Sequence, residues 1–185
     1  MLATSYKSIS VASLTLLNPV GLSGEWLPVL TGRAGQRLNG TALDRLIAAD
    51  AAIQPGTATA ADPDALSEYA AAIYPAWFAF PELAAVLSPP RSTSITGAAV
   101  SARLRREGYD WHATVRSLPM PSLLIHGTAD LLTLDMARDT VATLGPLATL
   151  LPVQNAGHNP FWEQPSIVFP AIDQFLARVE HGRRP

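Results

Sequence analysis

The sequence has no cysteine among its 185 residues, and charged residues make up only 15% of it. The lack of cysteine excludes disulfide bonds, thiolate metal sites and a cysteine nucleophile. The basic residues are dispersed, apart from Arg103, Arg105 and Arg106, which we expect on a solvated helix face. No basic surface suited to nucleic acid is therefore predicted.

Long apolar runs are also missing, since none approaches the roughly 18 residues that a membrane-spanning helix needs. The N-terminal stretch "MLATSYKSISVASLTLLNPVGLSG" has small residues and an apolar run, as secretory signals do. Serine and threonine interrupt that run, however, and Lys7 is the one basic residue before it. We favour the end of a helix followed by a buried strand, in a cytoplasmic protein without a membrane partner.

Hydrophobic residues are abundant, at 48% of the chain, which is enough for one compact domain with a core. Three near-continuous apolar runs are typical of strands buried on both faces: Val11–Leu17, Ser122–His126 and Ala148–Val153. A helical pattern follows the second run, from Thr133 to Gly145. Another follows the third run and carries an apolar stripe formed by Val168, Ile172, Phe175, Leu176 and Val179. This order predicts the α/β class with a parallel sheet.

A stretch of different character, residues 25–112, separates the first run from the second. It is rich in Ala, Pro and Trp and has no convincing strand pattern. We expect a helical lid over a pocket, with structural filler as the alternative, because inserted helices in α/β enzymes often cover a pocket. The core is then formed by residues 1–24 and 113–185. The expected lid helices are Thr41–Gln54, one that starts at Asp62-Pro63 and runs toward Trp77, and Ile95–Glu107, which Gly108 ends.

Two polar motifs follow the second and third runs. "LLIHGTAD" places Asp130 a few residues past a buried strand, and "LLPVQNAGHNPFWEQP" places His158, next to Gly157, just past the next strand. The carboxyl ends of neighbouring parallel strands open onto one edge of the sheet, where ligands bind. We therefore expect Asp130 within hydrogen-bond reach of His158. Such a carboxylate orients the imidazole and stabilises the imidazolium that forms when the base of a nucleophilic hydrolase takes a proton.

Other titratable residues near these motifs receive different interpretations. Asp135 and Asp139 are expected as charges of the following helix, although either is an alternative acid. His126 is expected to pack in the core. His112 and His181 are expected at the surface.

The sequence resembles the α/β-hydrolase fold family. The resemblance rests on "HGTAD" and "AGHNPFWEQP", on the separation between these two motifs, and on the core segments on both sides of an insertion. The two motifs are similar to its acid loop and histidine loop. The segment "YPAWFAFPE" is, more loosely, similar to the lid of proline iminopeptidase-like members. The resemblance implies a Ser-His-Asp mechanism on ester or amide bonds, with Asp130 as acid and His158 as base and with no cofactor or metal. It also implies a nucleophile, usually serine, on a G-x-S-x-G elbow that precedes the acid.

Ser23, in "VGLSGEW", first suggests such a nucleophile. The spacing is not G-x-S-x-G, because Gly24 follows the serine directly. We also expect no helix after Ser23, whereas an elbow needs a helix N-terminus and a backbone N–H behind the nucleophile to form an oxyanion hole. In the resemblance, "VASLTLLNPVG" matches the strand that precedes the lid, and "MLATSY" matches the elbow helix. No nucleophile is therefore assigned within the chain, and it is expected upstream of Met1.

This interpretation makes the chain the C-terminal part of an α/β-hydrolase, without the first strands, the oxyanion loop and the nucleophile. We expect the isolated chain to be inactive, and its apolar edge at Val11–Leu17 to favour aggregation or a homo-oligomer. One alternative is a dehalogenase or epoxide hydrolase with an aspartate nucleophile on the same fold. The other is a non-catalytic, truncated pseudo-hydrolase.

The expected partner is a small, largely apolar substrate molecule, because the lid is rich in large aromatic side chains. In a proline iminopeptidase-like enzyme, a lid glutamate such as Glu68 or Glu82 would hold the free amine of the substrate. Phe161 and Trp162 either wall the pocket or pack in the core. The large aromatic side chains of the lid on which the apolar substrate is predicted are Trp26, Trp77, Phe78 and Phe80.

Overall fold

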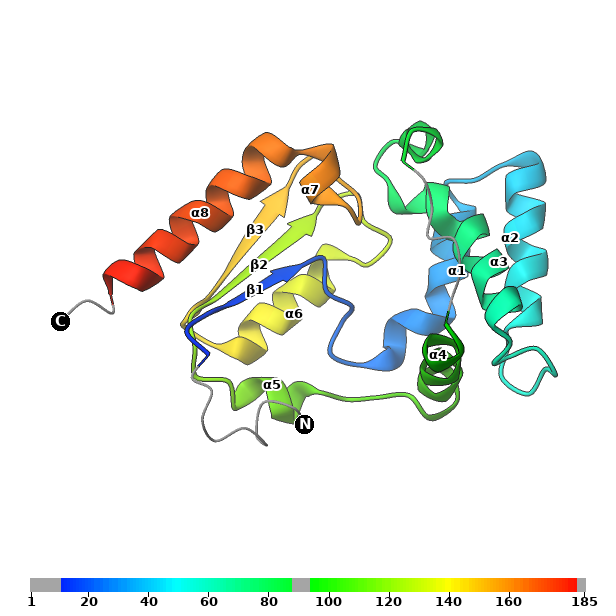
Figure 1. The fold of residues 1–185 in the computed structure, drawn as a ribbon, viewed down its shortest axis with the longest axis horizontal. Coiled ribbons are helices and arrows are strands. Elements are labelled where there is room, and N and C mark those ends of the chain that lie inside the picture. The colour runs from blue at the N-terminus through cyan, green and yellow to red at the C-terminus, as the bar shows by residue number, and fades with distance from the viewer. Residues whose placement is uncertain (1–10, 88–93, 183–185) are drawn as a thin grey trace.

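A parallel sheet with helices on both faces occupies one side of the molecule, and the helical insertion lies beyond the carboxyl ends of the strands (Figure 1). The computed structural model describes residues 11–87 and 94–182. The helix end expected in "MLATSY" lies outside the described residues. The α/β class predicted from the sequence is confirmed.

Three strands form the sheet in the order β1 (Leu14–Leu17), β2 (Ser122–Gly127) and β3 (Ala148–Val153), and all neighbours run parallel. Strand β3 has the predicted bounds, and β2 is one residue longer than predicted. The first residues of the three strands are in register with one another. Their carboxyl ends therefore reach the same edge of the sheet.

Strand β1 is shorter than the predicted Val11–Leu17. Pairing begins at Leu14, whose N–H donates to the carbonyl of Pro121 at 3.0 Å. Proline has no N–H for a sheet ladder, so Pro121 stops the pairing from extending toward Val11. Strand β1 is bonded to β2 alone within the described parts of the chain, which leaves its outer edge unpaired.

Helices cover both faces of the sheet. Helix α6 (Leu134–Leu144) packs on one face, and α7 (Pro160–Glu163) and α8 (Pro165–His181) pack on the other (Figure 1). Helix α6 begins after Thr133 and is followed by Gly145, at a φ of +83°, as predicted. The core under α8 is formed by Leu123, Ile125, Val153, Ala156, Val168 and Phe175.

The apolar stripe predicted on α8 faces the sheet except at one residue. Val168 and Phe175 are buried, and Ile172 and Val179 pack against the same cluster. Leu176 is 41% exposed, so the prediction was wrong there. Consecutive helical residues point about 100° apart, and Phe175 already takes the inward direction.

The insertion is built from short helices. Asp62 caps one of them, accepting a hydrogen bond from the N–H of Asp64 at 2.8 Å, and Pro63 takes the first helical position, as predicted. Helix α4 also has its predicted bounds, while α2 begins and ends slightly earlier than predicted. The proposed domain boundaries at residues 24 and 112 stay a prediction. The elements are η1 (Gly24–Trp26), α1 (Leu27–Gly35), α2 (Gly40–Ala52), α3 (Pro63–Ile73), η2 (Tyr74–Trp77), η3 (Pro81–Ala85) and α4 (Ile95–Glu107), and α5 (His112–Arg116) leads back to β2.

The expectation that no helix follows Ser23 was wrong. The turn η1 starts at Gly24 and continues into α1. Pro28 lies in the first turn of α1, where its missing N–H would have no helical partner anyway. Proline there starts the helix instead of interrupting the chain.

The insertion is joined to the sheet at two places. Its two connecting segments pair with each other, since Gly24 N–H donates to Tyr109 O at 3.1 Å and Trp111 N–H donates to Leu22 O at 2.8 Å. Leu131 and Leu132, which follow β2, are buried in the hydrophobic core of the insertion. The loop after β2 is thus held by both parts of the molecule.

No helix within residues 11–87 and 94–182 is long and apolar enough to cross a membrane.

Candidate active site

Asp130 lies in the loop that follows β2, and its side chain is fully buried. One carboxylate oxygen accepts the N–H of Leu132 at 3.1 Å, and the other accepts the amide of Asn18. Burial of a carboxylate is tolerated when such donors surround it. The Asp130 side chain is therefore held in one orientation.

His158 lies in the loop that follows β3, with its side chain 30% exposed. Its Nδ1 is 2.9 Å from Oδ2 of Asp130, a hydrogen bond between residues 28 positions apart. Its backbone N–H donates to the carbonyl of Trp77, at 2.6 Å, in the insertion. The structure therefore brings the two expected site residues together, with Nε2 of His158 as the ring nitrogen left for a reacting proton.

Asn18 completes this arrangement, and the sequence analysis did not find it. It directly follows β1, at a φ of +42°, and only 3% of it is exposed. Its Nδ2 donates to Asp130 and to the carbonyl of Gly157 at 3.0 Å, and its Oδ1 accepts the N–H of Gly127 at 3.2 Å. The available signal was an asparagine directly after a buried strand, since Asn adopts this left-handed conformation more readily than most residues.

Two glycines allow the acid and histidine loops to approach each other. A Cβ on Gly127 would overlap the carbonyl oxygen of Gly157, and a Cβ on Gly157 would overlap that of Trp77. Any larger residue at either position would push backbone segments apart. The glycine next to His158 therefore serves close packing of the loop against the insertion.

Glu163, at the end of α7, is a second residue that the sequence analysis missed. Its carboxylate accepts the N–H of Gly157 at 2.7 Å and that of Ala79 at 2.8 Å. Burial raises the pKa of Glu163 above its ordinary value, and these N–H groups act in the opposite direction. This side chain ties the histidine loop to the insertion.

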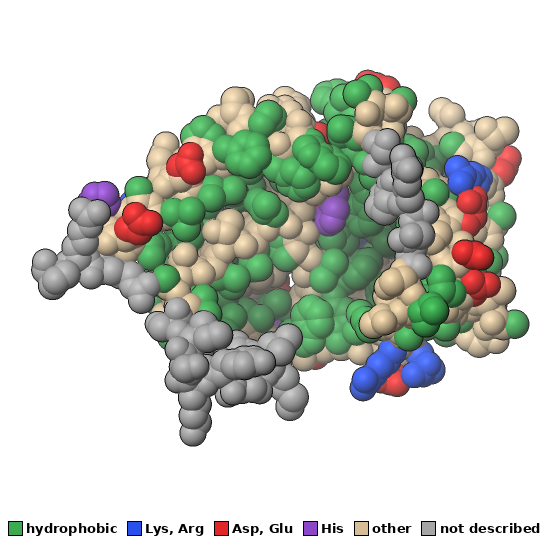
Figure 2. Space-filling model, viewed as in Figure 1, with side chains coloured by type: hydrophobic (Ala, Val, Ile, Leu, Met, Phe, Trp, Pro, Cys, Tyr) green, Lys and Arg blue, Asp and Glu red, His purple; other side chains and the backbone are tan. Residues whose placement is uncertain are grey.

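His158 opens into a cavity of about 460 Å³ under the insertion. The Trp77 ring lies against the imidazole, with the ring centroids 4.4 Å apart. Figure 2 shows hydrophobic side chains around the hollow between the two parts of the molecule, with a histidine among them. The lining residues are Val20, Trp26, Leu27, Leu30, Leu66, Tyr69, Ala70, Ile73, Tyr74, Trp77, Gly97, Ser101, Arg105, His158 and Asn159.

The aromatic residues expected around a pocket separate into two groups. Trp26 and Trp77 line the cavity. Phe78 is fully buried beside Tyr74 instead, and Phe80 is 48% exposed. Phe161 packs in the core under α8, and Trp162 is 49% exposed, so neither walls this cavity.

No nucleophile is hydrogen-bonded to His158 among the described residues. Ser23 does not line its cavity and instead pairs with Asp110 where the insertion joins the core. Ser101 does line the cavity, but it lies inside α4, where the backbone N–H groups serve the helix and none is left for an oxyanion.

The remaining titratable residues have other roles. His126 is fully buried, with Nε2 2.8 Å from the carbonyl of Leu132, as expected for a core residue. Asp135 pairs with Arg138 on the surface, and Asp139 pairs with His112. Neither aspartate contacts His158, so neither takes the place of the Asp130 carboxylate.

The lid glutamates are not placed to hold a substrate amine. Glu68 forms an exposed ion pair with Arg45, and Glu82 does not line the cavity of His158. Within the described ranges, no group of three potential ligands is arranged to bind a metal ion.

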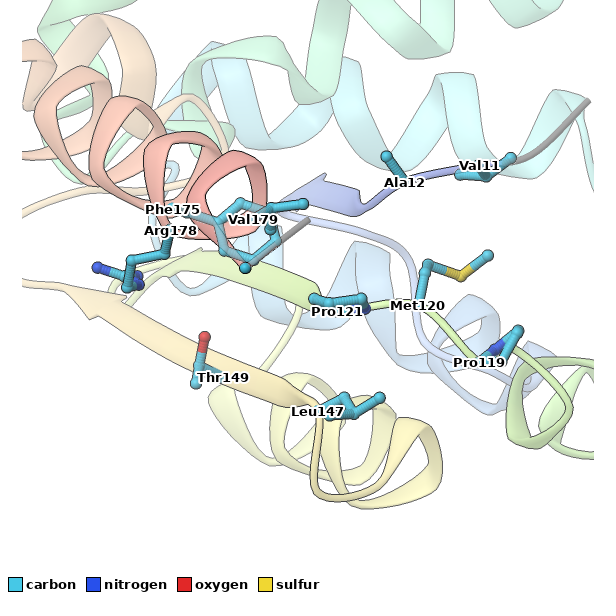
Figure 3. A pocket seen from close by; sticks show the side chains of 11 residues that line it. Val11, Ala12, Pro119, Met120, Pro121, Leu147, Thr149, Phe175, Arg178 and Val179 are labelled. Carbon is cyan, nitrogen blue, oxygen red and sulfur yellow. The ribbon is translucent and has the colours of Figure 1, made fainter. Parts of the chain in front are cut away.

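A second cavity, of about 480 Å³, lies at the opposite edge of the sheet, where the strands begin (Figure 3). Its walls come from the residues before β1, β2 and β3 and from the last turns of α8. Pro121, Leu147 and Phe175 line it, with Arg178 at its rim. It is remote from Asp130 and His158 and lacks a base.

Comparison with solved structures identifies the fold. VinJ aligns with 94% of this chain over 60% of its own length, with a TM-score of 0.59 and 15% identity. An α/β fold family hydrolase from Bacillus anthracis str. Sterne aligns with 92% of this chain over 59% of the hydrolase's own length, with a TM-score of 0.54 and 18% identity. BpoC from Mycobacterium tuberculosis H37Rv, a candidate non-heme bromoperoxidase, aligns with 91% of this chain over 59% of its own length, with a TM-score of 0.52 and 19% identity. No protein-family model and no curated protein matches the sequence.

The chain therefore has the α/β-hydrolase fold that the resemblance implied. It spans about three fifths of the length of these neighbours. The proline iminopeptidase-like character of the lid stays a prediction.

Proposed function

We propose that this chain carries the acid and the base of a hydrolase that transfers the acyl group of an ester or amide to water. The observation that carries the proposal is the hydrogen bond of 2.9 Å between His158 Nδ1 and buried Asp130, at the wall of an apolar cavity. Paired residues of this kind, at the carboxyl ends of neighbouring parallel strands, occupy the place where ligands bind in such sheets.

In the proposed reaction, His158 Nε2 takes the proton of an attacking hydroxyl and then gives it to the leaving group. Asp130 accepts Nδ1–H, which fixes the tautomer, and its negative charge stabilises the imidazolium. Asn18 and the N–H of Leu132 hold Asp130 in place. The nucleophile and the oxyanion donors belong, in this proposal, to residues outside the described ranges, in the part of the fold that this chain does not share with its neighbours.

Kinetics with p-nitrophenyl butyrate test the proposal. The assay compares the 185-residue chain with the same chain preceded by the residues encoded upstream of Met1. We expect turnover of the extended protein only. His158→Ala should lower its kcat/KM by about a hundredfold to ten-thousandfold, the usual contribution of general acid–base catalysis. Asp130→Asn should lower kcat by a comparable or larger factor, because the wrong tautomer is then favoured.

Ser23→Ala is the matched control and should leave the rate of the extended protein within about twofold. Turnover that is unaffected by His158→Ala would contradict the acid–base pair. Turnover by the 185-residue chain that is lost in Ser101→Ala or Ser23→Ala would place the nucleophile inside it. A folded extended protein without any esterase or amidase activity would favour a binding protein on this fold.

A further inference from the structure

The cavity that contains His158 also contains a second basic residue, Arg105 of α4. Its other walls are mostly aliphatic and aromatic side chains. No aspartate or glutamate lines it among the residues that the structure describes. Enclosed basic groups with apolar walls create a positive potential that attracts anions.

Arg105 differs from its two neighbours on the same helix. Arg103 and Arg106 have exposed side chains, and both pair with Glu107 at 2.7 and 2.8 Å. The Arg105 guanidinium instead lies over the ring of Tyr69, with Cζ 5.2 Å from the ring centroid. Its Nε is buried and has no hydrogen-bond partner in the described part of the chain.

Three carboxylates, those of Glu25, Asp50 and Asp110, line an adjacent cavity that Arg105 also reaches. The Asp50 carboxylate accepts hydrogen bonds from Thr31 and Gln54, each at 2.8 Å. Within the described ranges, none of the three forms an ion pair with Arg105 at 4.0 Å or less. The partner of the Arg105 guanidinium is thus the Tyr69 side chain, and no carboxylate in the described ranges neutralises its charge.

We propose that the substrate carries a carboxylate, separated by an apolar segment from the bond that is hydrolysed. Arg105 binds that carboxylate, the aliphatic and aromatic walls bind the segment, and the reacting carbonyl lies beside His158. This assignment rests on the proposed function for the position of the reacting bond. Arginine suits the role because its planar fork binds carboxylates through two parallel hydrogen bonds.

Ligand binding to the 185-residue chain tests the assignment without any catalysis. The probes are the monomethyl esters of succinate, adipate and suberate, and the corresponding dimethyl esters, titrated by NMR. We expect at least one monoester to bind tenfold more tightly than its dimethyl ester. Arg105→Met should remove that preference, whereas Arg105→Lys, which keeps the charge, should weaken monoester binding less than Arg105→Met does.

Arg106→Met is the matched control, one residue away on the same helix, and should bind the monoester like the wild type. Circular dichroism confirms that each variant is folded. Equal affinity for mono- and dimethyl esters, or equal effects of Arg105→Met and Arg106→Met, would overturn the assignment. If the monoester binds through Arg105 but the extended protein shows no His158-dependent turnover, the proposed function fails and the carboxylate site remains. If the extended protein hydrolyses neutral esters through His158 without any carboxylate preference, only the carboxylate site fails.

Discussion

Asn18 meets two requirements of the site at once. Its backbone turns out of β1 at a positive φ, and its side chain bonds to the acid loop and to the histidine loop. Alanine could supply neither the hydrogen bonds nor a relaxed backbone at this position. The geometry of Asp130 and His158 therefore depends on a residue more than a hundred positions away from either.

We expect Asn18→Ala to lower the free energy of unfolding by about 2–4 kcal/mol, because it leaves Asp130 and the N–H of Gly127 with one partner fewer. Urea unfolding followed by fluorescence measures the loss. Asn155→Ala is the control, since Asn155 also has a positive φ, of +55°, but is exposed. It should cost only the backbone strain, about 1 kcal/mol. Equal losses in the two variants would show that the side-chain bonds of Asn18 contribute nothing.

At this scale, the sequence allowed two site residues to be predicted and concealed two others. Asp130 and His158 each follow a buried strand, and parallel strands bring such positions to one edge. Asn18 bonds to Gly127 and Gly157, which the pairing of the three strands brings near it. Glu163 bonds to Ala79, which the packing of the insertion brings near it. Neither kind of long-range approach is visible in the local sequence pattern.

Among residues 11–87 and 94–182, no strand pairs with the outer edge of β1. The N–H groups of Leu14 and Asn18 donate toward β2, at 3.0 and 2.9 Å. Because alternate residues of a parallel pair bond to the same neighbour, Thr15 and Leu17 direct their backbone groups to the outer edge. The side chain of Leu17 is 40% exposed there. Such an edge pairs readily with another chain.

We expect the 185-residue chain to self-associate through this edge, and Leu17→Lys to increase its monomer fraction severalfold. A lysine on an edge strand disfavours edge-to-edge pairing. Sedimentation velocity at several concentrations measures the monomer fraction. Ile167→Lys is the control, since Ile167 is similarly exposed, at 42%, but lies on α8. A monomeric wild-type chain at all concentrations, or an equal effect of the two lysines, would contradict this expectation.

His112 links α5 to α6 next to the segment that leaves the insertion. Its Nδ1 is 2.7 Å from Asp110 and its Nε2 is 2.9 Å from Asp139. These two hydrogen-bonded carboxylates raise the pKa of His112 above its ordinary value. The pKa of His112 in the unfolded chain is about 6.5. The stability that protonated His112 contributes to the folded protein is therefore fully present below that pH. It is lost as the pH rises through the higher pKa of the folded state.

His112→Gln should consequently lower the free energy of unfolding more at pH 6 than at pH 9. Thermal unfolding at both pH values, compared with the wild type, gives the difference. His181→Gln, at the exposed end of α8, is the control for the replacement of a surface histidine. A loss in His112→Gln that is the same at both pH values would indicate that the charged form of His112 contributes no stability.

Elements were predictable where local signals marked both ends. Helix α4 has a capping serine, Ser94, at one end and Gly108 at the other, and its bounds were predicted correctly. Helix α1 was missed because Pro28 and the glycines around it indicate a loop. Its buried residues, Leu30 and Ala34, gain their stability from packing in the insertion, which the local pattern does not reveal.

In the whole molecule, the site lies where the sheet and the insertion meet. The sheet contributes Asp130 and His158, and the insertion contributes Trp77 and Arg105. The order of strands and helices was enough to predict the α/β class with a parallel sheet. The cavity was not predictable in the same way, because its lining comes from several separate elements whose packing determines which side chains face His158.

The chain spans about three fifths of the neighbouring structures, and the proposed function requires a nucleophile that the described residues do not place beside His158. Labelling of the extended protein with a fluorophosphonate probe, followed by mass spectrometry of the labelled peptide, locates that residue directly. We expect the label on a serine outside the 185 residues, and labelling that is at least a hundredfold slower in His158→Ala. A label on Ser23 or Ser101, or a labelling rate that is unchanged in His158→Ala, would contradict the account.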